Sequence, residues 1–259
     1  MERTLKTLSK SILVAIVFTV IGFQAMAQEN LLGKVTYQKK EVFEIKGLED
    51  LPENMKTMMP TDRKTNHELL FSNEASLYQN AKNVDNDVNI SQDMGGGNEV
   101  QIQIKEPESY LYFNYEKKEI VEETEFMSRR FLITTPTDTV KWQIVGNQKE
   151  IAGYKCIEAK LVGSDEGLKA WFAPEIPVST GPDNYTGLPG LILGLSTEKG
   201  DLVIEATSIE MGNIDPKEIK KPKKGKKVSH TEFAKIRAEK MKEMEEATGG
   251  HMMIIQIDE

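Results

Sequence analysis

The sequence has little of the side-chain chemistry that enzymes use for nucleophilic attack or metal binding. It contains one cysteine, Cys156, and three histidines, of which only His67 lies outside the C-terminal tail. A single cysteine excludes an intramolecular disulfide, and its alternating surroundings favour a buried, small apolar side chain. A cysteine–histidine nucleophile would have to join Cys156 to His67, and no motif around either residue supports it.

Motifs of hydrolases and nucleotide-binding proteins are absent as well. The chain has no Gly-x-Ser-x-Gly, no His-Glu-x-x-His, no Walker loop and no dinucleotide-binding fingerprint. The glycine run at 95–97 lacks the lysine and the Ser or Thr that a phosphate-binding loop needs. Acidic residues are plentiful, and within strands we expect them to mark a solvated face. The sequence therefore predicts a protein that is not an enzyme.

Beyond the first residues, no apolar run is long enough to span a membrane. The N-terminal run, residues 12–23, follows three basic residues and precedes a small-x-small pattern at Ala25-Met26-Ala27. This arrangement is typical of a cleaved export signal, which we assign to residues 1–27. We expect the mature protein to be periplasmic or secreted, and not to span the membrane.

The chain has fewer basic than acidic residues, 33 against 41. The formal net charge is −8 at pH 7, and removal of residues 1–27 would lower it to −10, because three basic residues and one acidic residue leave. A chain this acidic repels phosphate backbones, so nucleic acid is excluded as a partner.

Residues 28–214 have the pattern of short β-strands. Alternating or β-branched apolar stretches recur there, each bounded by Gly, Pro, Asn or Asp. The predicted strands are 34–45, 67–78, 110–115, 119–125, 129–133, 141–145, 154–162, 168–173, 191–195 and 202–208. We expect a loop or one helical turn within 48–66 and a long flexible insertion at 79–98. The pattern predicts a mainly β domain, an antiparallel meander that forms a curved sheet, a sandwich or a partial barrel.

The C-terminal residues differ in composition. Residues 215–228 are rich in lysine and proline, which predicts an exposed linker. Ser229 and Glu232 have the spacing of a capping box, so residues 229–259 are expected to hold a helix at about 230–247 and a tail. The apolar run 252–257 predicts an edge strand.

One segment, residues 181–193, combines rigid turn residues with an apolar strand. Pro189 and Gly190 have the order that a type II turn requires, and a short buried strand is expected to follow from Leu191. Gly194 predicts either a bulge in that strand or a close approach of another backbone. Two interpretations stay open: a core strand entered through a rigid turn, and an apolar ligand or partner site at the rim of a sheet.

The same segment resembles the signature Gly-Leu-Pro-Gly-Leu-Ile of the GLPGLI family of exported proteins of the Bacteroidota. The stretches 151–156 and 170–178 precede it in the order and spacing of that family. In place of the family's frequent Trp-Tyr-Thr, the chain has Trp171-Phe172-Ala173. The resemblance implies an exported, β-rich protein.

The concentration of apolar and turn residues around this signature predicts a binding site. Its candidate residues are Trp171, Tyr185, Leu188, Pro189, Gly190 and Leu191. The expected partner is an envelope or outer-membrane protein, a lipid or a peptide, because ligand pockets are mostly apolar with few polar groups. The alternative is that the aromatic residues fill the core of the sheet.

Methionine clusters support an alternative function, Cu(I) binding in the periplasm. The candidate ligands are Met55, Met58, Met59, His251, Met252 and Met253. Thioether sulfur suits Cu(I), and imidazole can complete such a site. Methionine also fills irregular gaps in cores, which is the structural alternative. A third hypothesis is an adaptor whose basic linker and C-terminal helix recruit a membrane partner.

Overall fold

The computed structural model describes residues 31–42, 44–46, 53–57, 60–82, 84–93, 99–104, 106–137, 140–247 and 254–256. Contacts divide the chain after Leu31, and every described helix and strand belongs to the unit Leu32–Glu259. About half of the described residues lie in strands.

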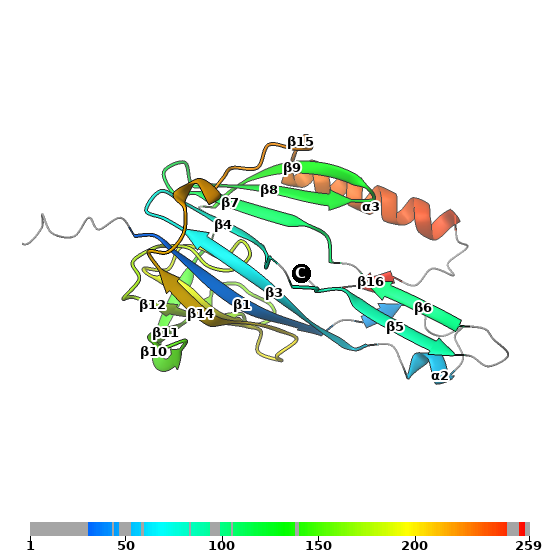
Figure 1. Ribbon diagram of the computed structural model, residues 1–259, viewed down its shortest axis with the longest axis horizontal. Helices are drawn as coiled ribbons and strands as arrows, with labels where there is room; N and C mark the ends of the chain where they lie inside the picture. Colours follow the sequence, from blue (N-terminus) through cyan, green and yellow to red (C-terminus); the bar gives the residue numbers. More distant parts are fainter. Residues whose placement is uncertain are drawn as a thin grey trace, which may run out of the picture. The chain divides into compact units, whose positions relative to one another are not determined.

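Twelve strands form one open sheet (Figure 1). These strands are β1 (Gly33–Val42), β3 (Asp62–Phe71), β4 (Ala75–Asn80), β7 (Ser109–Asn114), β8 (Glu119–Phe126), β9 (Arg129–Pro136), β10 (Trp142–Ile151), β11 (Tyr154–Leu161), β12 (Lys169–Ala173), β13 (Leu191–Ser196), β14 (Leu202–Met211) and β15 (Lys226–Ser229). Their order is β10-β11-β12-β13-β14-β1-β3-β4-β7-β8-β9-β15. Neighbours are antiparallel except β15, which pairs in parallel with β9. The predicted mainly β, antiparallel fold is confirmed, and it takes the form of an open sheet.

Two short pairs of strands and three helical segments complete the described elements. β2 (Glu44–Lys46) pairs with β16 (Ile254–Gln256), and β5 (Val88–Asp93) pairs with β6 (Glu99–Ile104). The helical segments are α2 (Glu53–Lys56), η1 (Pro216–Glu218) and α3 (His230–Ala247). A loop or one helical turn was expected within 48–66, and α2 is such a turn.

The prediction of a flexible insertion at 79–98 was wrong over β5. Val88 and Ile90 alternate with polar residues and face an alternating partner strand at 99–104. This alternation of apolar and polar residues was overlooked because the surrounding Asn, Asp and Gly residues favour turns and loops.

Alternation of side chains divides the sheet into two faces. We call the face that carries Val35, Tyr37, Leu69 and Phe71 the inner face, and the opposite face the outer face. These four side chains are at most 1% exposed. The inner face therefore holds the centre of the hydrophobic core.

Within the predicted linker 215–228, residues 221–224 contact the outer face of β8, and the following residues 226–229 form β15 at the edge of the sheet. Lys221 Nζ lies 2.9 Å from Glu119 Oε1, and the Lys224 backbone N–H donates to Glu123 Oε2 at 3.2 Å. A Cβ at Gly225 would lie 2.8 Å from the backbone carbonyl carbon of Arg130, so the chain approaches β9 closely. Lys221 thus neutralises an acidic side chain of the sheet.

Helix α3 begins at the predicted capping box. The Ser229 N–H donates to Glu232 Oε2 at 2.7 Å, and the Glu232 N–H donates to Ser229 Oγ at 3.2 Å. Phe233 packs against Phe126 and Phe131, with ring centroids 6.1 and 5.1 Å apart, so the first turn of the helix docks on the sheet. None of the described helices has the length and apolar character needed to cross a membrane.

The turn at Pro189 and Gly190 is not the predicted type II turn. The Gly190 N–H donates to the Leu188 carbonyl at 2.9 Å, which closes a three-residue γ-turn on Pro189. Gly190 is required by a close approach, since a Cβ there would lie 2.4 Å from the Ala173 carbonyl oxygen. The predicted buried strand follows as β13, and its register with β12 shifts between Trp171 and Phe172, opposite the expected bulge at Gly194.

Replacement of Gly190 by alanine should destabilise the protein more than replacement of a glycine in open space. We expect Gly190→Ala to lower the free energy of unfolding by about 1–3 kcal/mol through overpacking against Ala173. Gly153→Ala is the matched control, because Gly153 has a φ of 84° but no atom lies within 4 Å of the position that its Cβ would take. Urea denaturation measures both, and equal losses would contradict the close approach.

Candidate functional site

The signature segment lies on the inner face and connects strands that are distant in sequence. The Tyr37 hydroxyl donates to the Ile192 carbonyl at 2.6 Å, and Ser76 Oγ lies 2.8 Å from Thr180 Oγ1. Tyr37 is fully buried, and burial raises the pKa of its hydroxyl well above its usual value. The segment is therefore held by polar contacts as well as by apolar packing.

Four charged side chains form a partly buried network beside this segment. Lys39 Nζ lies 2.7 Å from Glu41 Oε1 and 3.2 Å from Asp183 Oδ2, while Arg63 Nη2 lies 3.0 Å from Glu41 Oε2. Tyr37, Lys39 and Glu41 share the inner face because side chains alternate along β1. Asp183 has a φ of 52°, a conformation that aspartate tolerates better than most residues. This network attaches the signature to the sheet.

The electrostatic balance of the network favours its charged forms. Burial alone would raise the pKa of Glu41, but Lys39 and Arg63 outweigh it and lower the pKa below its usual 4.5. Burial alone would lower the pKa of Lys39, but Asp183 and Glu41 outweigh it and raise the pKa. Lys39 and Glu41 are therefore both ionised and compensate each other near neutral pH.

A second polar group lies further along β3 on the same face. His67 Nε2 lies 2.9 Å from Thr65 Oγ1 and 3.3 Å from Glu106 Oε1, and its ring stacks on Tyr78 at 5.1 Å between centroids. Burial and the nearby carboxylates raise the pKa of the Tyr78 hydroxyl. Three buried atoms of this region have no hydrogen-bond partner among the described residues: Arg63 Nε, Tyr78 OH and Glu106 Oε2.

Neither polar group was predicted from the sequence. Acidic residues in strands were expected to mark a solvated face, whereas Glu41 is 6% exposed on the inner face. The alternation of side chains along 35–41 was visible in the sequence. The ion-pair partners of these residues, however, come from β3 and from the segment near Asp183. No local signal in the sequence identifies those long-range partners.

The structure places the residues of the predicted signature site in different environments. Leu188, Gly190 and Leu191 are buried, Pro189 is exposed, and Tyr185 is half-buried. Tyr185 packs edge-on against Trp142 at 6.3 Å, and the Trp142 Nε1–H donates to the Thr186 carbonyl at 2.7 Å. Leu188 and Leu191 thus belong to the core, and ligand binding at the signature stays a prediction from the sequence.

Trp171 lies away from the other predicted residues, on the outer face. Its register partners are Glu158 and Gly194, and the Lys149 ammonium lies 4.9 Å from the centre of its ring. Lys149 also pairs with Glu205 at 2.9 Å. The structure therefore does not bring Trp171 together with Tyr185 and Leu188.

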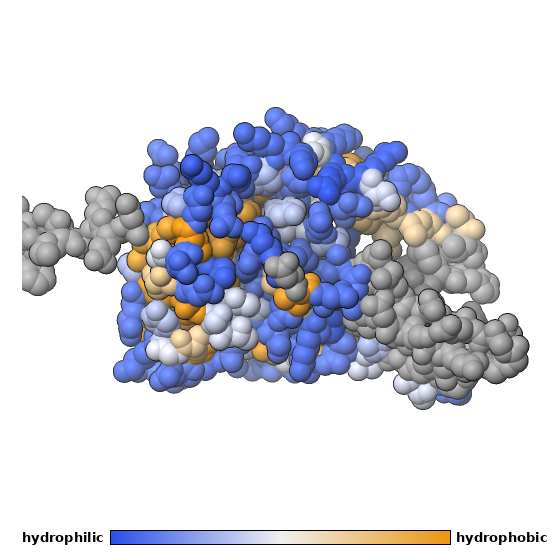
Figure 2. Space-filling view, viewed as in Figure 1, coloured by the Kyte–Doolittle hydropathy of each residue, from blue (hydrophilic) through white to orange (hydrophobic). Residues whose placement is uncertain are grey.

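The end of the sheet at β10 is open and carries exposed apolar side chains. Ile144, Val145 and Val162 are 54%, 42% and 57% exposed. Val145, Gly146 and Asn147 stand opposite Glu158 alone, so β10 bulges in its middle. Figure 2 shows apolar surface gathered at the part of the molecule where Figure 1 draws β12 and β14, within a largely hydrophilic face.

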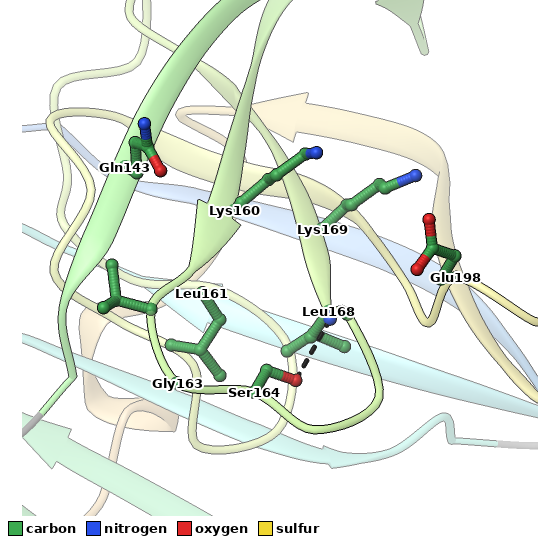
Figure 3. A pocket seen from close by; sticks show the side chains of 10 residues that line it. Gln143, Lys160, Leu161, Gly163, Ser164, Leu168, Lys169 and Glu198 are labelled. Carbon is green, nitrogen blue, oxygen red and sulfur yellow. Dashed lines mark hydrogen bonds between the residues drawn. The ribbon is translucent and has the colours of Figure 1, made fainter.

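A pocket of about 320 Å³ lies where β11 turns into β12 (Figure 3). Its lining combines apolar side chains with charged and amide groups. The residues are Gln143, Lys160, Leu161, Val162, Gly163, Ser164, Gly167, Leu168, Lys169 and Glu198. Leu168 is buried beneath the pocket, and Ser164 Oγ accepts a hydrogen bond from its N–H at 3.1 Å.

The remaining candidates stand apart from these sites. Cys156 is buried, as predicted, and burial raises the pKa of its thiol to about 11; its Sγ donates to the Tyr154 carbonyl, and His67 is not its partner. Met55 lies in α2, with a side chain outside the described set. The other proposed copper ligands, Met58, Met59 and 251–253, lie outside the described residues. Cu(I) binding stays a prediction from the sequence.

Removal of the Lys39 ammonium should be costly because it leaves Glu41 and Asp183 without their shared cation. We expect Lys39→Met to lower the free energy of unfolding at pH 7 by about 3–5 kcal/mol. Lys40→Met is the control, since Lys40 makes an exposed ion pair with Asp62 at 3.3 Å and should lose at most about 1 kcal/mol. Equal losses in urea denaturation would refute the role of the network.

The same measurement has a predicted pH dependence. The lowered pKa of Glu41 means that its contribution is present above pH 4.5 and disappears as the pH falls through its folded-state value. The raised pKa of Lys39 means that its contribution is present below pH 10.5 and disappears only in more alkaline solution. The difference between wild type and Lys39→Met should therefore shrink below pH 4.5.

Comparison with known proteins relates the chain to a family and to a fold. Residues 162–194 match the model of a family described as protein of unknown function (Porph_ging), which is associated with the Bacteroidota. The matched residues run from the β11–β12 turn to β13 and include the Leu188–Leu191 turn. No curated protein matches the chain.

Two solved structures of PNGF-II are similar to the chain, one in space group C2 and one in P21. Their TM-scores are 0.53 and 0.51, and their sequence identities to the chain are 14% and 15%. Each match covers 79% of this chain and 32% of the PNGF-II chain. The chain thus spans about a third of the length of PNGF-II, and the likeness is one of fold.

Proposed function

We propose that the protein is an exported, non-enzymatic binding protein of the cell envelope, of the GLPGLI type. Its partner is an apolar, peptide-like segment, which contacts the open end of the sheet formed by β10, β11 and β12. The observation that carries this proposal is the exposure of Ile144, Val145 and Val162 at one end of a sheet whose other apolar side chains are largely buried. Exposed apolar groups of this kind mark interaction surfaces.

The bulge in β10 favours side-chain contacts over the addition of another strand. An unbroken edge strand presents a regular row of N–H and C=O groups and invites strand pairing or aggregation. In β10 that row is interrupted at Val145, Gly146 and Asn147, and the Asn147 amide donates to Glu158 Oε2 at 2.5 Å. The bulge places Val145 outward and shortens the regular edge, so the surface can hold a partner without extending the sheet.

The inner face is a poorer candidate for this role. The signature segment contacts it, and the charged groups Lys39, Glu41 and Asp183 are paired with one another. A ligand there would have to displace those ion pairs and expose a buried network, at a cost of several kcal/mol. We therefore assign the inner face to stability and the open end to binding.

Selection of peptides tests the proposal directly. We expect the mature protein, panned against phage-displayed random dodecapeptides, to enrich sequences with apolar residues. Val162→Lys and Val145→Lys should each weaken binding of the enriched peptides by about tenfold, the effect of losing one buried valine contact.

Val42→Lys provides the matched control for this experiment. Val42 is 39% exposed at the end of β1, close to the exposure of Val145, but it lies away from β10. Its variant should bind the enriched peptides as the wild type does. Failure to enrich any peptide, or equal loss in Val42→Lys, would count against the proposed function.

A further inference from the structure

We propose that the pocket at the β11–β12 turn binds a carboxylate of the partner segment between Lys160 and Lys169. The inference rests on the proposed function, since the pocket adjoins the same open end of the sheet. It adds the chemical class of the partner: an apolar peptide segment with one acidic group beside the residue that contacts Val162.

The two lysines stand directly opposite each other on neighbouring strands. Gln143, Lys160 and Lys169 are register partners across β10, β11 and β12, so the three side chains form a row on the outer face. Figure 3 shows the two lysine side chains extending in the same direction, with Glu198 beyond Lys169. Like charges directly opposite each other in a sheet are unfavourable unless a counter-charge lies between them.

Neither lysine forms an ion pair among the described residues. The described part of the chain places no carboxylate within 4.0 Å of either ammonium group, whereas Lys149, on the same face, is paired with Glu205. Glu198 lines the pocket without pairing with either lysine. Two lysines and one glutamate leave a single positive charge uncompensated, which matches a monoanionic carboxylate better than a doubly charged phosphate.

The apolar residues that line the pocket determine which chemical group of the partner lies next to the bound carboxylate. Among the residues that line the pocket, Val162 is exposed, Leu161 is half-buried and Leu168 is buried. Gln143 supplies an amide at the β10 side, where the partner segment would run. A carboxylate anchored by two lysines next to an apolar contact is the chemistry of a short peptide motif, with affinity from burial and specificity from charge.

The free protein offers a test that needs no partner. If the lysines repel each other, Lys160→Gln should raise the Tm by about 1–3 °C at low ionic strength, and the gain should vanish in about 1 M salt. Lys155→Gln is the matched control, because Lys155 lies on the same strand opposite Glu150 and should give no gain. An unchanged or lower Tm for Lys160→Gln would overturn the claim that the pair awaits a counter-ion.

The partner side is tested with the most enriched dodecapeptide, made synthetically. The wild type should bind this peptide about tenfold more weakly once its acidic residue becomes the amide analogue, Gln or Asn. The double variant Lys160→Gln, Lys169→Gln should be insensitive to that change. Comparison of the free-acid and C-terminally amidated forms shows whether the carboxylate comes from a side chain or from the chain end.

These outcomes separate the inference from the function on which it rests. Peptides whose binding depends on Val162 but not on the lysines would keep the proposed function and overturn the carboxylate site. Absence of any enriched peptide would overturn both. Loss of acid preference in the double variant, with apolar binding retained, is the result that the inference predicts.

Discussion

The hydrogen bond from Tyr37 to the Ile192 carbonyl and the ion pair between Lys39 and Asp183 are the contacts on which the arrangement depends. An open sheet with a strongly apolar inner face needs a cover, because a sheet exposed to water on both sides buries too little surface. The signature segment supplies that cover from within the chain. Its polar contacts fix where it lies, and its leucines complete the core.

This cover decides where a partner can bind. The signature segment lies on the inner face and buries Leu188, one of the residues that the sequence assigned to a binding site. Exposed apolar side chains and lysines without a carboxylate partner among the described residues lie instead at the open end of the sheet, around Lys160 and Val162. Other charged side chains do form ion pairs: Lys82 pairs with Glu218, Lys221 with Glu119, and Lys149 with Glu205.

The local pattern of apolar, polar and turn residues was sufficient to predict much of the fold. The strands, the capping box at Ser229 and the burial of Cys156 follow from alternation and turn residues, which act within a few positions. It was less reliable where local signals compete. Asn, Asp and Gly concealed β5, and the turn at Pro189 is a γ-turn in which the Ala173 carbonyl lies close to Gly190.

The sequence by itself thus determined the class of fold, the C-terminal helix and the rigidity of the signature, since each rests on the periodicity of neighbouring residues. Only the tertiary structure decided that Glu41 and His67 are buried, that Trp171 and Tyr185 lie on opposite faces, and that Lys160 and Lys169 meet. Each of these depends on strand order and register, which pair residues remote along the chain and leave no mark in any local stretch of it.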